Sequence, residues 1–164
     1  MEHARSLTRT HDLLGLGGWL ALCYLAAAVG SLATTTGVGT WYQTLDRPPW
    51  TPPDWVFGPV WTLLYGLMAV AAWLVWRRRG FRGATVALGL FLVQLALNVA
   101  WSFIFFGMHA VIWAAVEIVV LALAIVATVI AFWRISRPAS LLLAPYLAWV
   151  LFAAALNLAI ARMN

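Results

Sequence analysis

Long apolar runs, separated by short polar or glycine-containing segments, make up almost the whole of this 164-residue chain. A helix needs about 20 predominantly apolar residues to cross the hydrocarbon core of a bilayer. Five runs reach that length. They predict membrane-spanning helices at about residues 13–36, 55–76, 83–106, 110–133 and 139–161. We therefore expect an all-α integral membrane protein, a bundle of five transmembrane helices, in which a polar tail (residues 1–12) precedes a single transmembrane domain (residues 13–164).

One connection, between the first and second predicted spans, is long and rich in proline and tryptophan. It runs from Trp41 to Asp54 with the sequence WYQTLDRPPWTPPD. Proline fixes φ and lacks an amide donor, so the proline pairs at 48–49 and 52–53 exclude a helix there and favour extended, polyproline-like backbone. Flexible linkers are rich in glycine and serine, whereas this segment is aromatic. The pattern predicts a stiff lid over the helices, with Asp54 as the N-cap of the second span.

Composition supports the membrane assignment and explains the charge of the chain. Hydrophobic residues make up 65% and charged residues 9%. All ten basic residues are arginine, and with five acidic residues they give a net charge of +5. With the N-terminus in the cytoplasm, eight arginines fall on the cytoplasmic side and two, Arg47 and Arg162, fall outside. This positive-inside bias predicts a cytoplasmic N-terminus and an external C-terminus. It accounts for the net charge without a nucleic-acid partner.

Conventional catalytic and metal-binding patterns are missing from the sequence. The single cysteine, Cys23, cannot form an intrachain disulfide. His3 and His11 lie in the polar tail and His109 lies in a turn, so no metal site has a standard spacing. The sequence also has no serine–histidine–acid set and no glycine-rich phosphate loop. We therefore expect no bound metal and no acid–base triad.

Few polar side chains interrupt the predicted spans, and each costs free energy in the hydrocarbon core. Glu117 is the only formal charge on the third and fourth spans. Its carboxyl group either bonds a neighbouring helix or faces a ligand. One face of the third span carries two amides and two aromatic rings, those of Gln94, Asn98, Trp101 and Phe105. Each amide, in turn, either joins two helices or contacts a ligand.

Aromatic side chains gather at one depth beneath the predicted lid. Trp61 and Tyr65 share a face of the second span, and Trp149 and Ala153 share a face of the fifth. A rise of about 1.5 Å per residue puts Trp61 about 9 Å, and Asn98 about 12 Å, below the lid end of their helices. Such stripes are typical of packing or of an interfacial belt. Beneath a lid they also predict a cavity for a large, flat, apolar ligand such as a tetrapyrrole or a sterol.

Three motifs follow one another along the chain. The first is Trp50-Thr51-Pro52-Pro53, with Trp41-Tyr42 before it and Val60-Trp61 after it. The second is Asn98-x-x-Trp101-Ser102, and the third is Pro145-Tyr146-Leu147-x-Trp149. Together they resemble the TspO/MBR family, the translocator or tryptophan-rich sensory proteins, over about residues 13–162.

This resemblance implies a five-helix bundle whose first loop covers a pocket. It also implies that the pocket binds porphyrins such as protoporphyrin IX or haem as ligands, with no required cofactor. Matching motif positions imply the pocket residues Trp41, Tyr42, Pro52, Trp61, Asn98, Trp101, Ser102, Trp149 and Ala153. Tyr65 joins this set through the face it shares with Trp61, and Glu117 because it matches a position that is often acidic in the family.

The sequence is compatible with three functions. The first is the binding of a tetrapyrrole, with transport or sensing. The second is light- and oxygen-dependent degradation of protoporphyrin, in which Trp61 and Trp149 correspond to the two indoles that the family resemblance implicates. The third is a regulatory scaffold whose partner binding changes with the ligand.

Two further features concern sterols and self-association. The sterol motif of the family includes a tyrosine on the fifth span. Residues 156–162, LNLAIAR, contain no tyrosine, which argues against tight cholesterol binding. Small residues at the start of the third span permit close helix approach and predict a homodimer there. These residues are Gly80, Gly83, Ala84 and Ala87.

Overall fold

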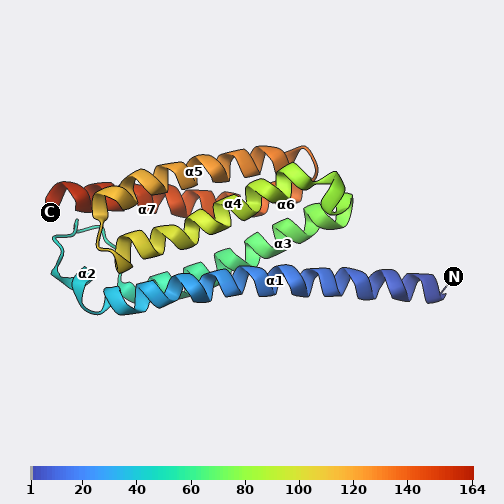
Figure 1. Ribbon diagram of the computed structural model, residues 1–164, viewed down its shortest axis with the longest axis horizontal. Helices are drawn as coiled ribbons and strands as arrows, with labels where there is room; N and C mark the ends of the chain where they lie inside the picture. The colour runs from blue at the N-terminus through green and yellow to red at the C-terminus, as the bar shows by residue number, and fades with distance from the viewer. Residues whose placement is uncertain (1) are drawn as a thin grey trace.

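Helices account for nearly all of the chain in a computed structural model, which describes the backbone of residues 2–164 and the side chains of residues 10–164 (Figure 1). No strand occurs within that part of the chain. The elements are α1 (Glu2–Val38), α2 (Trp41–Thr44), the 3₁₀ turn η1 (Asp54–Val56), α3 (Phe57–Gly83), α4 (Thr85–Ser102), the π-helical turn η2 (Phe103–Gly107), α5 (Val111–Trp133), α6 (Arg137–Leu142) and α7 (Ala144–Met163).

The five predicted spans are confirmed among the described residues. Five helical segments there are long and apolar enough to cross a membrane: Thr10–Val38, Asp54–Gly83, Thr85–Gly107, Val111–Trp133 and Arg137–Met163. The backbone of α1 is helical from Glu2, so residues predicted as a polar tail continue the helix of the first span. The protein is an integral, multi-pass membrane protein.

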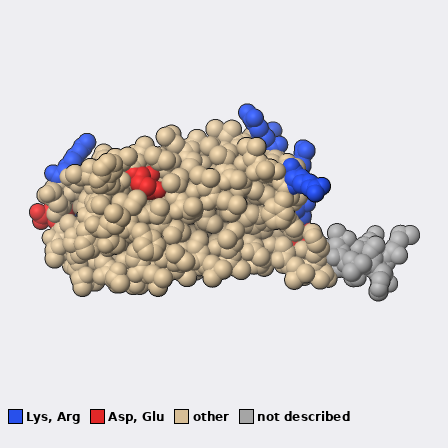
Figure 2. Space-filling model, viewed as in Figure 1, with Lys and Arg blue, Asp and Glu red and all other residues tan. Residues whose placement is uncertain are grey.

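The spans lie side by side in one bundle whose two ends differ (Figure 1). Helix α1 begins at the end where α3 passes into α4 and α5 into α6, whereas α2 and the loop after it lie at the opposite end, close to the end of α7. On the face shown in Figure 2, the blue arginine side chains stand only at the two ends of the molecule. The apolar surface between the two arginine groups is thus the part of this face that suits the hydrocarbon core.

Local breaks in the helices follow from single residues. Gly80, directly after three arginines, has φ 62 and ψ −177 and interrupts α3 near its end. A side chain at that φ would be strained, so glycine suits the position. Pro145 lies in the first turn of α7, where its missing amide proton costs least. The last two helices therefore cross the membrane as one interrupted span.

The core runs along the axis of the bundle and the lipid-facing surface is apolar. Phe91 of α4 stacks on Phe132 of α5 with ring centroids 5.9 Å apart, and both are fully buried. Large apolar side chains such as Leu25, Val86 and Leu123 are exposed on the outside. Such a surface suits hydrocarbon, where apolar side chains cost nothing.

Of the four small residues predicted as a dimer face, Gly83 is exposed and Gly80 is partly exposed, whereas the other two require a correction. Ala84 and Ala87 are only 3% and 4% exposed, because α4 turns them into the core of its own bundle. They are not available to a second copy. Small residues at helical spacing permit close packing, but the spacing alone does not say whether the neighbour belongs to the same chain.

Candidate functional site

The proline-rich loop forms a lid over one end of the bundle. Its first four residues form the short helix α2, and the segment between Thr44 and Asp54 contains no helix, as the prolines predict. Pro53 has φ −58 and ψ 143, which is polyproline backbone. The hydroxyl group of Thr51 donates to the carbonyl oxygen of Pro48 at 2.7 Å and closes a turn between the proline pairs. Short local bonds and fixed φ angles therefore hold the shape of the lid.

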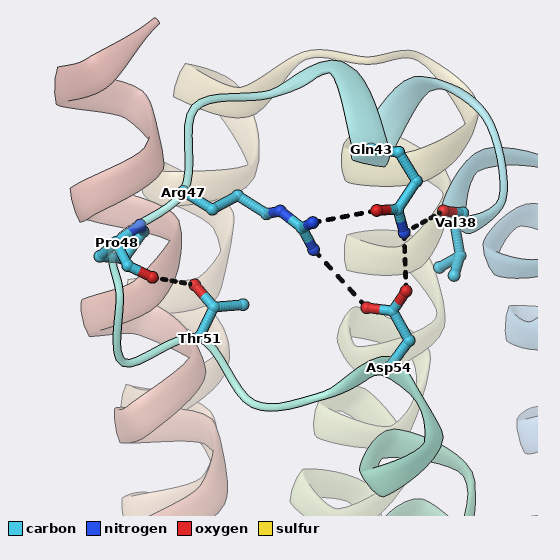
Figure 3. Close-up of polar contacts among 6 residues, drawn as sticks. All are labelled: Val38, Gln43, Arg47, Pro48, Thr51 and Asp54. Atoms are coloured by element: carbon cyan, nitrogen blue, oxygen red, sulfur yellow. Dashed lines mark hydrogen bonds and ion pairs between the residues drawn. The ribbon is translucent and has the colours of Figure 1, made fainter.

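Three polar side chains fasten the two ends of the lid to each other (Figure 3). Gln43 donates from Nε2 to Asp54 Oδ2 at 2.6 Å, and Arg47 donates from Nη2 to Gln43 Oε1 at 2.9 Å. Arg47 Nη1 also lies 3.6 Å from Asp54 Oδ1. The prediction that Asp54 caps the second span is wrong: within the described residues no side chain caps α3, because this carboxylate faces the lid. We call Gln43, Arg47 and Asp54 the latch.

Aromatic contacts seat the lid on the bundle. The ring of Tyr42 is buried and lies 6.1 Å from Phe105 and 5.7 Å from Phe106, which belong to η2. The guanidinium group of Arg47 lies 4.7 Å above the same tyrosine ring. Burial raises the pKa of the Tyr42 phenol above its ordinary value of 10.0, and the adjacent Arg47 opposes part of that rise. At neutral pH Tyr42 is therefore an uncharged aromatic anchor.

A cavity of about 640 Å³ lies beneath the lid. It is walled by α1, the start of α3, the outer half of α4 with η2, and α7. Eight of the predicted site residues line it: Tyr42, Trp61, Tyr65, Asn98, Trp101, Ser102, Trp149 and Ala153. Its volume falls within the usual range for small-molecule sites, roughly 300–1,000 Å³. The structure therefore brings together most of the predicted set.

A chain of buried hydrogen bonds forms the floor of the cavity. Tyr65 donates from its hydroxyl group to Asn98 Oδ1 at 2.6 Å, and Asn98 Nδ2 donates to the hydroxyl oxygen of Tyr146 at 3.1 Å. Tyr146 in turn donates to Gln94 Oε1 at 2.7 Å. The chain joins α3, α4 and α7, so both predicted amides do link helices. Asn98 also lines the cavity, and one of its two amide hydrogens is not used by these bonds.

Aromatic rings make up most of the cavity wall. Trp101 stacks on Phe105 with centroids 5.1 Å apart, and its indole Nε1 donates to Asn157 Oδ1 at 3.2 Å. Trp149 lies 6.0 Å from Phe57 and 5.5 Å from Phe152. These contacts fix the orientations of the rings, so the cavity presents flat apolar surfaces with few polar atoms.

Two predicted lid residues lie outside the cavity. Trp41 stacks on His109 at 4.3 Å and meets the edge of Phe105 at 5.5 Å, so it supports the wall from behind. Pro52 lies in a shallow polar recess on the lid with Arg47 and Thr51. Both belong to the predicted motif, but their side chains hold the lid and wall in place rather than face the cavity.

Glu117 also lies outside the cavity. Among the described residues, none from α5 lines it, because α4 and α7 stand between α5 and the empty space. Both carboxyl oxygens of Glu117 are buried, and neither has a hydrogen-bond partner within residues 10–164. The prediction that Glu117 faces the ligand is therefore wrong. The alternative, a hydrogen bond from its carboxyl group to a neighbouring helix, does not occur among residues 10–164 either.

The sequence did not identify the contribution of α1. Tyr24, Gly30, Ser31 and Thr34 all line the cavity. Their helical spacing and their small or hydroxyl side chains were a usable signal, since such a stripe stands out on an otherwise apolar helix. Further wall residues on α7 are Phe152, Leu156, Asn157 and Ile160. The part of the chain described here has no group of three or more His, Cys, Asp or Glu residues that could hold a metal ion.

Comparison with known proteins gives concordant matches. A sequence profile of the TspO/MBR family matches residues 19–163. The tryptophan-rich protein TspO of Chlorobaculum tepidum is 43% identical over 157 residues, which cover 93% of this chain and 98% of the relative. The translocator protein of Homo sapiens is 45% identical over 126 residues, 76% of this chain and 75% of that protein. The tryptophan-rich sensory protein of Cereibacter sphaeroides is 38% identical over 149 residues, 89% and 92% of the two chains.

Proposed function

Because the chain belongs to the TspO/MBR family, we propose that it binds tetrapyrroles, such as protoporphyrin IX or haem, in the cavity beneath the lid. The observation that carries this proposal is the composition of the cavity wall, where the indoles of Trp61, Trp101 and Trp149 surround one space. Flat aromatic surfaces with a few polar atoms favour a flat, largely apolar ligand. Ions and sugars would leave their polar groups unpaired there.

Each part of the cavity has a role in this proposal. Trp61 and Trp149 stack against the macrocycle from α3 and α7. Asn98 offers its remaining amide hydrogen to an oxygen of the ligand from the floor. The lid covers the bound ligand and keeps it from water. The names of two relatives speak of translocation and of sensing; either activity would follow from binding at this site.

Quenching of tryptophan fluorescence by protoporphyrin IX tests the proposed site. We expect Trp61→Phe and Trp149→Phe each to weaken binding about three- to tenfold, since a well-placed aromatic contact contributes roughly 0.5–1.5 kcal/mol. Trp113→Phe is the matched control, because Trp113 is exposed on α5 and does not line the cavity. Identical titration curves for all three variants and the parent would rule out this placement.

A second candidate function is light- and oxygen-dependent degradation of the bound porphyrin. The supporting observation is that Trp61 lies in the cavity wall with its ring 5.7 Å from the ring of Tyr65. In this proposal the photoexcited ligand and molecular oxygen supply the reactivity and the indoles act as redox partners, so no acid–base triad is needed. Illumination of the loaded protein should then bleach the porphyrin Soret band faster than in detergent alone. Equal bleaching rates would leave binding as the function.

The orientation in the membrane is also a proposal. Arg77 lies near the end of α3, Arg134 directly follows α5 and Arg137 begins α6, all at the end of the bundle where α1 begins. Arg47 belongs to the lid and Arg162 to the last turn of α7. We propose that the end with more arginines faces the cytoplasm and that the lid faces outward. A membrane-impermeant maleimide should label Thr44→Cys in intact cells, since Thr44 is exposed on the lid. Labelling only after the membrane is opened would reverse the orientation.

A further inference from the structure

The residues that line the cavity are not equally covered. Those on α4, η2 and α7 are buried or partly buried, whereas several on α1 and at the start of α3 are exposed. The exposed ones include Tyr24, Ala28, Ser31 and Thr35 on α1, and Gly58 and Thr62 on α3. The first four recur at i, i+4, i+7 and i+11, so they share one face of α1. The cavity is therefore least covered along the seam between α1 and α3.

Toward its beginning, α1 packs tightly against α3. A Cβ atom added to Gly15 would lie 2.1 Å from the ring of Trp76, so the two helices touch there without space for a side chain. The indole Nε1 of Trp73 donates to the carbonyl oxygen of Asp12 at 2.9 Å. Nearer the lid, the hydroxyl group of Tyr24 donates to the carbonyl oxygen of Thr62 at 3.0 Å.

Helix α1 also packs against α4, first where the ring of Trp19 meets the edge of Phe91 at 5.7 Å and then on the lid side of Tyr24. A Cβ atom on Gly30 would lie 3.4 Å from Ser102 Oγ, and one on Gly37 would lie 2.9 Å from the carbonyl oxygen of Phe106. Ala33, between the two glycines, is buried. This half of α1 thus lies against α4 and η2, and the seam with α3 opens. We call the opening above the Tyr24–Thr62 bond the slit.

The walls of the slit are suited to lipid. Ser31 donates its hydroxyl hydrogen to the carbonyl oxygen of Ala28 at 2.7 Å, and Thr62 donates to that of Gly58 at 2.9 Å. Because each hydroxyl group bonds its own helix, the slit presents no unpaired hydroxyl donor at these two positions. A lipid chain or a flat ring system can pass Ser31 and Thr62 without breaking a hydrogen bond between helices.

The length of the slit matches one leaflet. Tyr24 and Thr35 are eleven residues apart, so the slit is about 16 Å long at about 1.5 Å per residue. Half of a hydrocarbon core is about 15 Å. The slit is therefore long enough to face the hydrocarbon of one leaflet, whereas the latch and the Tyr42 contacts lie on the lid side of the cavity.

We propose that flat, lipophilic ligands enter and leave the cavity sideways, from the lid-side leaflet through the slit between α1 and α3, while the lid stays closed. The ligand class rests on the proposed function; the route does not. A ligand of this kind partitions into the bilayer, where its concentration far exceeds that in water. A lateral route uses that pool directly and does not require the latch to break.

Reversible cross-linking across the slit tests the route. In a Cys23→Ala background, Ser31→Cys and Gly58→Cys place thiols on both walls, and a Cβ atom at Gly58 meets no other atom within 4 Å. The matched control pair, Asp46→Cys and Asn164→Cys, pins the lid to the end of α7, where these two residues already pair. Both proteins are reconstituted in phosphatidylcholine vesicles, joined with a bis-methanethiosulfonate linker, and followed by quenching of tryptophan fluorescence by protoporphyrin IX.

The two pairs should behave differently. We expect the slit linker to slow association and dissociation at least about tenfold with little change in affinity, and a reductant to restore both rates. The lid linker should change each rate by less than about twofold. Slower binding with the lid linker and not with the slit linker, or no slowing with either, would overturn the lateral route.

A second measurement separates the route from the identity of the ligand. If the unlinked protein shows no quenching at all, the proposed function fails, but the route is still measured through Ala153→Cys, a thiol on the far wall of the cavity. A pyrene maleimide dissolved in the bilayer should label it about tenfold more slowly when Ala28→Trp fills the slit. Val29→Trp, exposed about 100° around α1 from Ala28 and away from the slit, should leave the labelling rate unchanged. Equal labelling with and without Ala28→Trp contradicts the proposal.

Discussion

The side-chain amide of Asn164 pairs with the backbone of Asp46 in the lid, 118 residues earlier in the chain. Asn164 Oδ1 accepts the Asp46 amide hydrogen at 3.1 Å, and Asn164 Nδ2 donates to the Asp46 carbonyl oxygen at 3.0 Å. Nδ2 also donates to the carbonyl oxygen of Ile160, in the last turn of α7. The lid is thus fastened to α7 as well as to itself by the latch.

Removal of this amide should loosen the lid. A hydrogen bond contributes about 0.5–1.5 kcal/mol net, so Asn164→Ala should speed hydrogen exchange of the Asp46 amide about tenfold. Hydrogen exchange with mass spectrometry of the lid peptides measures the change. Met163→Ala is the control, since Met163 is exposed next to Asn164. Equal exchange in the two variants would mean that the pairing does not hold the lid.

The hydrogen-bonded floor should be more costly to break than a bond at the slit. Tyr146→Phe leaves Gln94 Oε1 and Asn98 Nδ2 without their partner in a fully buried position. An unpaired buried polar group costs about 1–3 kcal/mol, so the melting temperature in detergent should fall by several degrees.

Tyr24→Phe is the matched comparison for the floor. It also removes one tyrosine hydroxyl group, but that group is exposed and bonds a backbone carbonyl. We expect a loss of stability below about 1 kcal/mol, because this variant removes one hydrogen bond and leaves no fully buried polar group without a partner. If both variants melt alike, the floor network contributes no more than an exposed bond.

Close packing of α1 on α3 depends on Gly15. Gly15→Ala places a methyl group against the rigid ring of Trp76, which must move. We expect a destabilisation of about 1–3 kcal/mol in thermal unfolding. Gly17→Ala, two residues along the same helix, meets no atom within 4 Å and should be neutral or stabilising by up to about 1 kcal/mol. A loss of stability in both variants would point to the helix backbone rather than to the contact.

The anchor residue Tyr42 should make stability depend on alkaline pH. Its pKa is raised in the folded protein, mainly by burial, so the folded state holds the phenol proton more tightly than the unfolded state does. The resulting stabilisation is fully present below the ordinary pKa of about 10 and is lost as the pH rises through the raised value.

Thermal unfolding at several values of pH between 8 and 12 measures this loss. The difference in stability between the parent and Tyr42→Phe should be constant below pH 10 and shift against the parent above it, because phenylalanine does not titrate. Other tyrosines affect both proteins equally. A difference that stays constant across the whole range would contradict the account of Tyr42.

Most of the architecture followed from local rules. A run of about 20 apolar residues has one low-energy solution in a bilayer, a helix that satisfies its own backbone. The break at Gly80 and the non-helical segment around Pro52 likewise follow from φ preferences of single residues. Neither conclusion needs knowledge of which helices are neighbours.

The direction in which single side chains face could not be predicted from the sequence. Glu117 stood out because it is charged, and Trp41 because it lies in a motif, yet neither lines the cavity. Helical spacing shows which residues share a face, but not which helix or space that face meets. Ala87 shows the same limit, since a small residue suits close packing inside the bundle as well as between two copies.

The amino-acid sequence by itself determined the five spans, the stiff lid after Trp41 and the band of aromatic residues beneath it, because hydrophobicity, proline geometry and helical rise are local properties. Tertiary structure alone decided that the lid-side half of α1 packs against α4 and η2, that Asp54 latches the lid instead of capping a helix, and that Asn164 holds Asp46. Each of these depends on the distance between residues far apart in the chain, which only the packing of whole helices sets.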